Sequence, residues 1–321
     1  MISSASHTIS PVQVYIGSEL ARYGFGQGHP FGPDRMDAFW HESIKQGLNK
    51  RVSMADPVAA AQGAIRRFHT SEYIQRVIKQ SETGHGFLDY GDTPAFKGIF
   101  EAAATVAGTG LAALETVLHG DCPRCFIPIA GLHHARRDMA AGFCVFNDAG
   151  ILIEALRSMY GIKRIAYVDI DAHHGDGVFY AFESDPDMWV VDMHEDGRYL
   201  YPGTGFANET GKGEAVGTKL NLPMLPESDD TDFHKLWPQA EAHVRQAKPE
   251  IIIFQCGADS IAGDPITHMR FSPAAHAHAA ASLCRIADEY CHGRIIALGG
   301  GGYNRGNLAT GWNAVLGQMC V

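Results

Sequence analysis

The chain has 321 residues, of which 45% are hydrophobic and 19% are charged, and its formal net charge is −10 at pH 7. This negative charge argues against nonspecific nucleic-acid binding. The longest apolar runs fall far short of a membrane span, and the first ten residues, MISSASHTIS, lack the basic and apolar stretches of a secretory signal. We therefore expect a cytoplasmic protein with no membrane or nucleic-acid partner.

The cysteines and the even composition indicate a single reduced domain. Seven cysteines, an odd number in a chain of this length, predict free thiols rather than a disulfide framework. The lone CxxC at 122–125 has no second pair, so these cysteines are interpreted as small core residues. No repeat, linker or low-complexity tract divides the sequence, which predicts one domain over residues 1–321.

Apolar strands and helical segments alternate along the chain. In chain order, the predicted elements are a helix over 98–118, a strand from 125, a helix over 147–160, strands from 164, 188 and 251, a helix over 272–291 and a strand from 294. Ser272 followed by Pro273 is typical of a helix start. The continuously apolar strands suit a parallel sheet buried on both faces. The sequence therefore predicts an α/β fold, a three-layer α/β/α sandwich with a mainly parallel central sheet.

Polar clusters follow these strands wherever they end. In an open parallel sheet, the functional crevice lies at the carboxyl ends of the strands. We therefore expect polar residues that are far apart in sequence to converge there. They are His133 and His134, Asp171 and His173, His194, Asp259 and Asp264, and Tyr303.

The densest cluster is the stretch DIDAHHGD at 169–176. In an extended segment, Asp169, Asp171 and His173 share one face. A carboxylate and an imidazole two residues apart can bind one zinc ion, and a third ligand would leave a position open for water. Asp264 is the candidate third ligand, because it follows another buried strand. A structural cluster of ion pairs is the alternative interpretation.

The residue spacing excludes two other kinds of site, an EF-hand calcium loop and a phosphate-binding loop. An EF-hand loop needs Gly at its sixth position and an acid at its twelfth, where this stretch has His174 and Tyr180. The segment LGGGGYN at 298–304 lacks the spacing of a phosphate-binding loop. Its glycines permit unusual backbone angles, which would let the Tyr303 hydroxyl approach a reaction centre and donate to an oxyanion.

The adjacent pair His133 and His134 gains significance from its position. Alone, such a pair is more often a packed histidine beside a solvated one. A zinc hydrolase, however, needs a base for the attacking water and an acid for the leaving group. Imidazole titrates in the right range, and a neighbouring carboxylate fixes its tautomer and raises its basicity.

Together these motifs resemble the zinc-dependent histone deacetylase superfamily, including bacterial acetylpolyamine amidohydrolases and acetoin-utilisation-type proteins. The resemblance covers nearly the whole chain in order. It rests on GHPFGPDR (28–35), HTSEY (69–73), YGDTPAFKGIF (90–100), HHARRDMAAGFC (133–144), VDIDAHHGDGV (168–178), YPGTG (201–205), GADSIAGDP (257–265) and GGGGYN (299–304). It implies the arginase/deacetylase α/β/α sandwich.

The resemblance also implies roles for individual residues. The zinc ligands would be Asp171, His173 and Asp264, with iron or cobalt as possible substitutes for zinc. The catalytic residues would be His134 as base and then acid with Asp176 as its partner, His133 as electrostatic helper with Asp169, and Tyr303 at the acyl carbonyl. The substrate-binding residues would be Gly142, Phe143 and Tyr201 along the channel, Asp92 at its rim and Arg35 in the inner cavity where acetate leaves.

Three positions depart from the pattern of the superfamily. Tyr201 stands where phenylalanine is usual, which predicts a more polar channel. Asp192, followed by Met193, stands where serine is usual in a structural potassium site that also includes Asp169. This change should strengthen cation binding or alter its selectivity. Phe271 is aligned with a rim glutamate of polyamine-selective relatives, which removes one argument for polyamines.

The favoured function is a zinc amidohydrolase that removes an acetyl or other short acyl group from a lysine-like or polyamine-like amine. One alternative is a binuclear manganese ureohydrolase, although the stretch Asp171-Ala-His173-His174-Gly175 lacks its last carboxylate. Another is a non-catalytic acyl-lysine binder, although Tyr303 and His134 are both present. Acetyl-lysine proteins, acetylpolyamines and small acylated metabolites all remain open as substrates, and the sequence makes no prediction about oligomeric state.

Overall fold

The structure is a computed structural model that describes residues 12–26 and 28–321. Within these residues, one eight-stranded sheet has the order β2-β1-β3-β8-β7-β4-β5-β6, and every neighbouring pair is parallel. The strands are β1 (Val12–Tyr15), β2 (Ser53–Ala55), β3 (Arg124–Ile127), β4 (Ile165–Asp169), β5 (Met188–Glu195), β6 (Lys219–Met224), β7 (Ile251–Gln255) and β8 (Ile295–Leu298). The predicted parallel sheet is confirmed.

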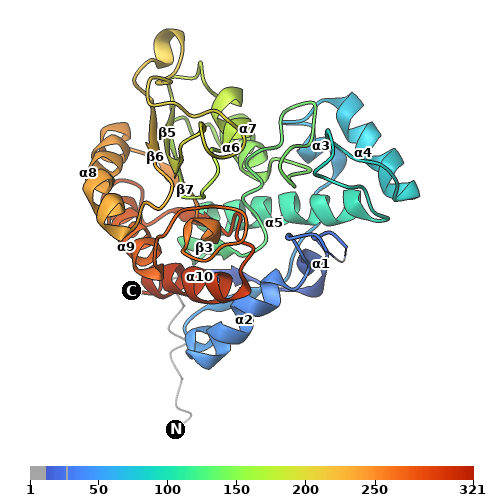
Figure 1. Ribbon diagram of the computed structural model, residues 1–321, viewed down its shortest axis with the longest axis horizontal. Helices are drawn as coiled ribbons and strands as arrows, with labels where there is room; N and C mark the ends of the chain where they lie inside the picture. Colours follow the sequence, from blue (N-terminus) through green and yellow to red (C-terminus); the bar gives the residue numbers. More distant parts are fainter. Residues whose placement is uncertain (1–11, 27) are drawn as a thin grey trace.

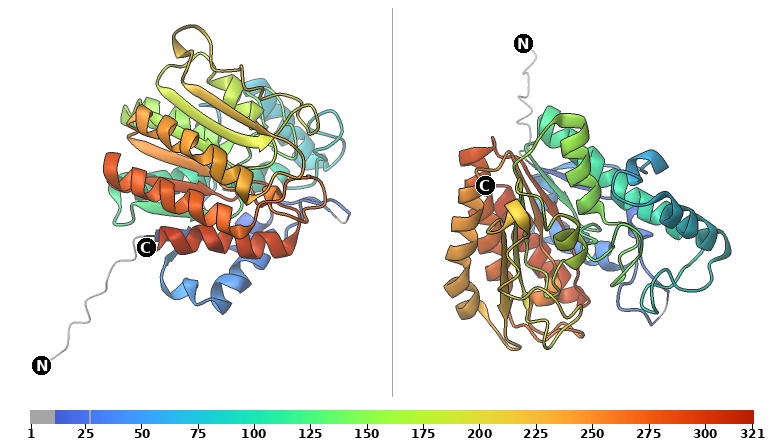
Figure 2. Two further views of the ribbon diagram at one scale, coloured as in Figure 1. Left: turned by 60° about the vertical axis from the view of Figure 1, so that its left-hand side comes forward. Right: turned by 90° about the horizontal axis from the view of Figure 1, so that it is seen from above.

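Helices cover both faces of this sheet and complete the predicted three layers. The helices are α1 (Ser18–Ala21), α2 (Arg35–Lys45), α3 (Gln62–Ile65), α4 (Ser71–Thr83), α5 (Ile99–His119), α6 (Asp148–Tyr160), α7 (Asp176–Ala181), α8 (Asp230–Ala247), α9 (Pro273–Tyr290) and α10 (Arg305–Met319), with 3₁₀ turns at Leu48–Lys50, Gly213–Ala215 and Ala258–Ser260. Helices α8 and α9 lie on one face, and α5 and α6 lie on the other (Figures 1 and 2).

The start of α9 follows from local chemistry. The Ser272 side chain accepts a hydrogen bond from the backbone N–H of Ala274, and Pro273 occupies the first helical position, where no donor is needed. The helix packs on β7 and β8. This start agrees with the prediction from the sequence.

The central strands are completely buried and end side by side. Every residue of β3, β4, β7 and β8 is buried, as expected for apolar strands covered by helices on both faces. Strand β4 lies between β5 and β7, so Asp169 is paired in register with Asp192 on one side and Gln255 on the other. The polar residues that follow these strands are thereby brought to one edge of the sheet.

Strand β6 forms an edge of the sheet and contains two unusual residues. Lys219 is only 2% exposed, and its ammonium donates to the carbonyls of Asp185 and Met188 and to the Thr218 hydroxyl. Burial lowers the pKa of Lys219 to about 8. Pro223 lies in the same strand, in register with His194 of β5.

The sequence predicts free cysteines and no membrane-spanning segment. All seven cysteines are free thiols, and six of them are buried. Across the residues that the structure describes, no helix has the length and apolar character needed to cross a membrane.

Candidate active site

A compact group of two carboxylates and one imidazole lies where β4 and β7 end. The metal-ligating atoms of Asp171, His173 and Asp259 all lie within 4.8 Å of one another. Nδ1 of His173 is 3.1 Å from Oδ1 of Asp171 and 3.1 Å from Oδ2 of Asp259. Asp171 and His173 follow β4 directly, and Asp259 lies in the 3₁₀ turn that follows β7. Because β4 and β7 are neighbours, the sheet brings the three side chains together.

This group contains Asp259, whereas the third ligand predicted from the sequence is Asp264. The carboxylate of Asp264 accepts hydrogen bonds from the backbone N–H groups of Tyr303 and Ile266, at 2.8 and 3.1 Å. Asp264 therefore also anchors the loop that carries Tyr303. It remains the predicted third ligand, and Asp259 is a second carboxylate near His173.

Neighbouring glycines leave room for the two carboxylates. A Cβ atom at Gly257 would lie 2.2 Å from Oδ2 of Asp171, and a Cβ atom at Gly301 would lie 2.1 Å from Oδ2 of Asp259. Burial and the charge of Asp171 raise the pKa of Asp259 to about 7. Two buried carboxylates whose oxygens lie within 4.8 Å of each other are stabilised by a cation. Two oxygens with one nitrogen form a donor set that suits zinc. The residues present therefore fit a bound zinc ion.

The adjacent histidines are each paired with a different buried carboxylate. Nδ1 of His133 lies 2.8 Å from Oδ2 of Asp169, and Nδ1 of His134 lies 2.7 Å from Oδ1 of Asp176. Burial alone would lower the pKa of His133, but Asp169 and Asp171 raise it to about 10. Burial and the neighbouring positive charge of His133 lower the pKa of His134 to about 4. At neutral pH, His133 is therefore charged and His134 is neutral.

His134 and His173 face a cavity of about 250 Å³. It is lined by Asp92, His134, Gly142, Phe143, His173, Leu200, Tyr201, Ile266 and Tyr303. A Cβ atom at Gly142 would lie 2.4 Å from Cδ2 of His134, so a glycine is needed beside this imidazole. The aromatic rings of Phe143 and Tyr303 meet edge to face, with centroids 5.8 Å apart. Most of the predicted channel residues therefore line one cavity.

Arg35 lies beneath the glycine loop that precedes Tyr303. Its side chain is fully buried and donates to the carbonyls of Gly302 and Gly300, at 3.0 and 2.5 Å. Its guanidinium stacks on the Phe31 ring, 3.8 Å from the ring centroid. Nη1 is buried and has no hydrogen-bond partner among the described residues. Arg35 thus presents an unpaired donor near the base of the site.

The structure corrects the predicted rim residue Phe271. This side chain is completely buried, forms a strand-like bridge with Ile261 and packs edge to face on Phe233. Ile266 lines the cavity instead. The rim is therefore apolar, as predicted for Phe271, but the apolar side chain is that of Ile266.

Asp192 of the predicted potassium site is paired with His194, and the sequence analysis did not predict this pairing. Oδ1 of Asp192 lies 2.6 Å from Nδ1 of His194, and its Oδ2 accepts the N–H of Gly175 at 2.9 Å. Burial would lower the pKa of His194, but Asp192 raises it above its ordinary value. Asp192 is thus paired with a buried histidine, while Met193 is buried in the core.

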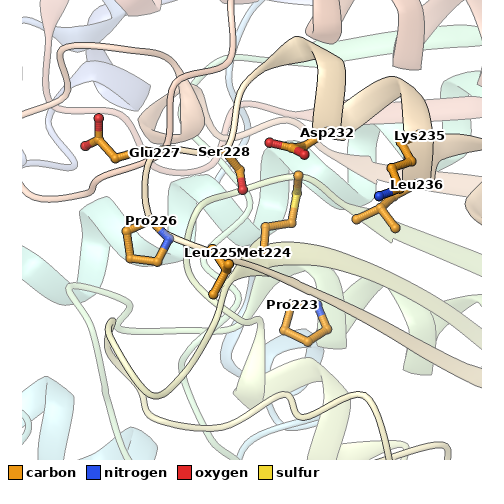
Figure 3. A pocket seen from close by; sticks show the side chains of 9 residues that line it. All are labelled: Pro223, Met224, Leu225, Pro226, Glu227, Ser228, Asp232, Lys235 and Leu236. Carbon is orange, nitrogen blue, oxygen red and sulfur yellow. The ribbon is translucent and has the colours of Figure 1, made fainter.

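A second hollow of about 320 Å³ lies at the end of β6 (Figure 3). It is lined by Pro223, Met224, Leu225, Pro226, Glu227, Ser228, Asp232, Lys235 and Leu236. Its lining contains no histidine or cysteine and none of the predicted site residues. The groups suited to hydrolysis are therefore in the smaller cavity.

Comparison with known proteins agrees with this geometry. The histone deacetylase domain family matches residues 29–319, a span that includes every residue of the cavity. The chain belongs to the histone deacetylase family. Membership of this family supports a hydrolase that acts on amide bonds.

Relatives of this histone deacetylase family member occur in bacteria and eukaryotes. The chain is 35% identical over 296 residues to the acetoin utilization protein AcuC of Bacillus subtilis (strain 168), across 88% of this chain and 75% of that protein. It is 30% identical over 317 residues to histone deacetylase clr6 of Schizosaccharomyces pombe, across 96% and 76%. The crystal structure of the HDA15 HD domain has a TM-score of 0.87 at 25% identity, with coverage of 96% of this chain and 88% of that chain.

Proposed function

We propose that the protein is a zinc-dependent deacetylase that hydrolyses an N-acetyl or short N-acyl amide of a lysine-like or polyamine-like amine. One observation carries this proposal. His134, His173 and Tyr303 line one cavity, and His173 belongs to the buried Asp171–His173–Asp259 group. A metal ligand set, a proton acceptor and an oxyanion donor are the three parts that amide hydrolysis at a metal requires.

Asp171 and His173 would hold the zinc ion together with Asp264, the third ligand that the resemblance to the family implies, and iron or cobalt could occupy the same ligands. The carboxylate of Asp259, which is 3.1 Å from Nδ1 of His173, is a second candidate for the third ligand. When bound, the ion supplies Lewis acidity toward the acyl oxygen and lowers the pKa of water. Gly257 and Gly301 leave room for the carboxylates of Asp171 and Asp259. Binuclear manganese chemistry is less favoured, because position 175, where a further carboxylate would be needed, is glycine.

His134 would move the proton. Its Nδ1–H is held by Asp176, so Nε2 is the nitrogen available to take a proton from the attacking water and return it to the leaving amine. The low pKa of His134 keeps the imidazole neutral, as a base must be. His133, held by Asp169, would remain protonated and place a positive charge beside the developing negative charge.

Tyr303 would donate its hydroxyl to the oxyanion that forms as the carbonyl is attacked. Gly142, Phe143 and Tyr201 would form the walls around the alkyl chain, and Asp92 would hold the substrate at the rim. The unpaired Nη1 of Arg35 would receive the acetate that leaves.

A monovalent cation would lie behind the zinc ligands. We expect the backbone carbonyls of Asp169, Asp171 and His173 to bind potassium, with Asp192 and Met193 on the neighbouring strand. Because Asp192 is already paired with His194, the selectivity of this cation site should differ from that of a serine-containing site.

The deciding experiment is hydrolysis of acetyl-lysine peptides and acetylated polyamines by the purified, zinc-loaded protein. We expect release of acetate from at least one of these classes and loss of that activity in His134→Ala. Binding of acetyl-lysine without turnover would instead support a non-catalytic acyl-lysine binder. Absence of both binding and turnover across the two classes would contradict the proposed substrate.

A further inference from the structure

The loop that carries the rim residue Asp92 is organised by a single carboxylate. Oδ1 of Asp89 accepts hydrogen bonds from the backbone N–H groups of Gly91, Asp92 and Thr93, each at 2.9 Å. Its Oδ2 accepts the hydroxyl of Thr93 at 2.6 Å. Hydrogen bonds to an ionised acceptor are stronger than those between neutral groups. Asp89 therefore fixes the backbone on which the Asp92 side chain is mounted.

The Thr93 hydroxyl extends this network to the wall of the channel. While it donates to Asp89, it accepts the backbone N–H of Phe143 at 3.1 Å. Thr93 is completely buried, so water cannot replace this acceptor. The side chain of one threonine thus connects the rim loop to the segment that bears the channel phenylalanine.

Phe143 needs such an anchor because its backbone is strained. Its φ is +67°, a left-handed conformation that is unfavourable for a bulky residue. The N–H of Phe143 is held by Thr93, and its carbonyl accepts the hydroxyl of Tyr23 at 2.7 Å. The two bonds hold both ends of the strained residue and direct its ring into the cavity.

His29 forms a second connection between the rim loop at Asp92 and the channel wall at Phe143. Its Nδ1 accepts the N–H of Phe31 at 3.1 Å, which leaves Nε2–H to donate to the Asp92 carbonyl at 3.3 Å. Its ring also contacts the Phe143 ring edge to face, with centroids 4.5 Å apart. The rim and the wall are therefore linked through both hydrogen bonding and packing.

We propose that Thr93 is a positioning residue that couples the rim carboxylate of Asp92 to the channel wall at Phe143, with Asp89 as its anchor. This inference rests on the proposed deacetylase function, in which Asp92 holds the substrate and Phe143 contacts its alkyl chain. Thr93 is not among the residues that line the cavity. It acts by keeping two substrate-binding residues in one mutual geometry.

The test compares Thr93→Val with Thr93→Ser. Valine keeps the shape of threonine but removes the hydroxyl, which leaves the Phe143 N–H without an acceptor, whereas serine keeps the hydroxyl. For an acetyl-lysine peptide, we expect Thr93→Val to raise KM about tenfold, the effect of one buried unsatisfied donor. The kcat should fall less than about threefold, because His134 and Tyr303 are unchanged. Thr93→Ser should restore KM to within about threefold of that of the natural protein.

A large change in KM with a small change in kcat distinguishes a positioning role of Thr93 from damage to the fold. Partial unfolding would reduce the amount of active enzyme and hence the apparent kcat, with KM unchanged. A result in which Thr93→Val lowers kcat alone, or in which valine and serine behave alike, would overturn the proposed coupling.

Amide hydrogen exchange gives a readout that does not require turnover. In Thr93→Val, we expect faster exchange in both 89–93 and 141–145, with natural exchange in both segments of Thr93→Ser. If 141–145 remained as protected as in the natural protein, the coupling would be wrong even for an active enzyme. If the natural protein hydrolysed no acetylated amine while both segments responded together, the coupling would stand and the proposed deacetylase function would fail.

Discussion

Nε2 of His133 lies 3.1 Å from Nε2 of His134, yet the pKa values of these neighbouring imidazoles move in opposite directions. The cause is the number of carboxylates that each one faces. His133 lies near both Asp169 and Asp171, whereas His134 is paired with Asp176 and experiences the positive charge of His133. Two titratable groups with separated pKa values can take different roles in one reaction.

The pH dependence of the rate should report this separation. A base must be deprotonated to act, and the pKa of His134 is lowered to about 4. We therefore expect kcat/KM to stay high below pH 6.5, the ordinary pKa of histidine, and to fall only as the pH approaches the lowered value. The measurement is a pH–rate profile on the best acetylated substrate. An acidic limb with its midpoint above pH 6.5 would contradict the assignment of His134 as base.

The Tyr303 hydroxyl should matter mainly in the transition state. Tyr303→Phe keeps the ring that packs on Phe143 but removes the oxyanion donor. One such donor is worth about 3–4 kcal/mol, so turnover should fall about 100- to 1,000-fold. Affinity for the uncharged substrate should change much less, because the negative charge develops during attack. Single-turnover rates and ligand binding test this expectation, and normal turnover would exclude the mechanism.

Replacement of the two aspartates after β7 should identify the third metal ligand. Asp264→Ala removes the third ligand predicted from the sequence, so we expect zinc affinity to fall at least about 100-fold. Asp259→Ala is the matched comparison, because Asp259 lies 3.1 Å from Nδ1 of His173. Metal analysis of both variants after dialysis decides between the two aspartates. Full zinc occupancy in Asp264→Ala, with zinc lost in Asp259→Ala, would assign the third ligand to Asp259.

Metal binding should release protons. Burial would lower the pKa of His173, but Asp171 and Asp259 raise it to about 10 in the metal-free protein. A zinc ligand must be a neutral imidazole, so uptake at pH 7 should release about one proton from His173. Zinc affinity should consequently rise with pH between 6 and 9. Calorimetry in buffers with different ionisation enthalpies measures this release, and a binding enthalpy independent of the buffer would contradict it.

The elements buried on both faces were the ones that the sequence made evident. Strands β4, β7 and β8 are continuous apolar runs, and the side chains after them lie where parallel topology requires. The short strand β2 has three residues and none of them is buried, and β6 contains Lys219 and Pro223. Neither has an apolar pattern that distinguishes it from a loop.

The exact ligand and rim residues depend on turns that strand patterns do not specify. Asp259 and Asp264 both follow β7, and the 3₁₀ turn at Ala258–Ser260 brings Asp259 within 3.1 Å of Nδ1 of His173. The same loop brings Ile266 to the cavity and returns Phe271 to the core. The partnership of Asp192 with His194 was also missed, although the two-residue spacing on one strand places both side chains on the same face.

The proline in β6 limits what can attach to this edge of the sheet. The Met224 carbonyl accepts the Asp196 N–H on the β5 side, so the preceding residue, Pro223, faces the open side, where it has no N–H to offer. At the first residue of the strand, the N–H of Lys219 is directed to the Thr210 carbonyl of the preceding loop. An incoming strand would therefore find one donor missing and another already occupied. This edge is thus protected against the strand addition by which exposed sheets aggregate.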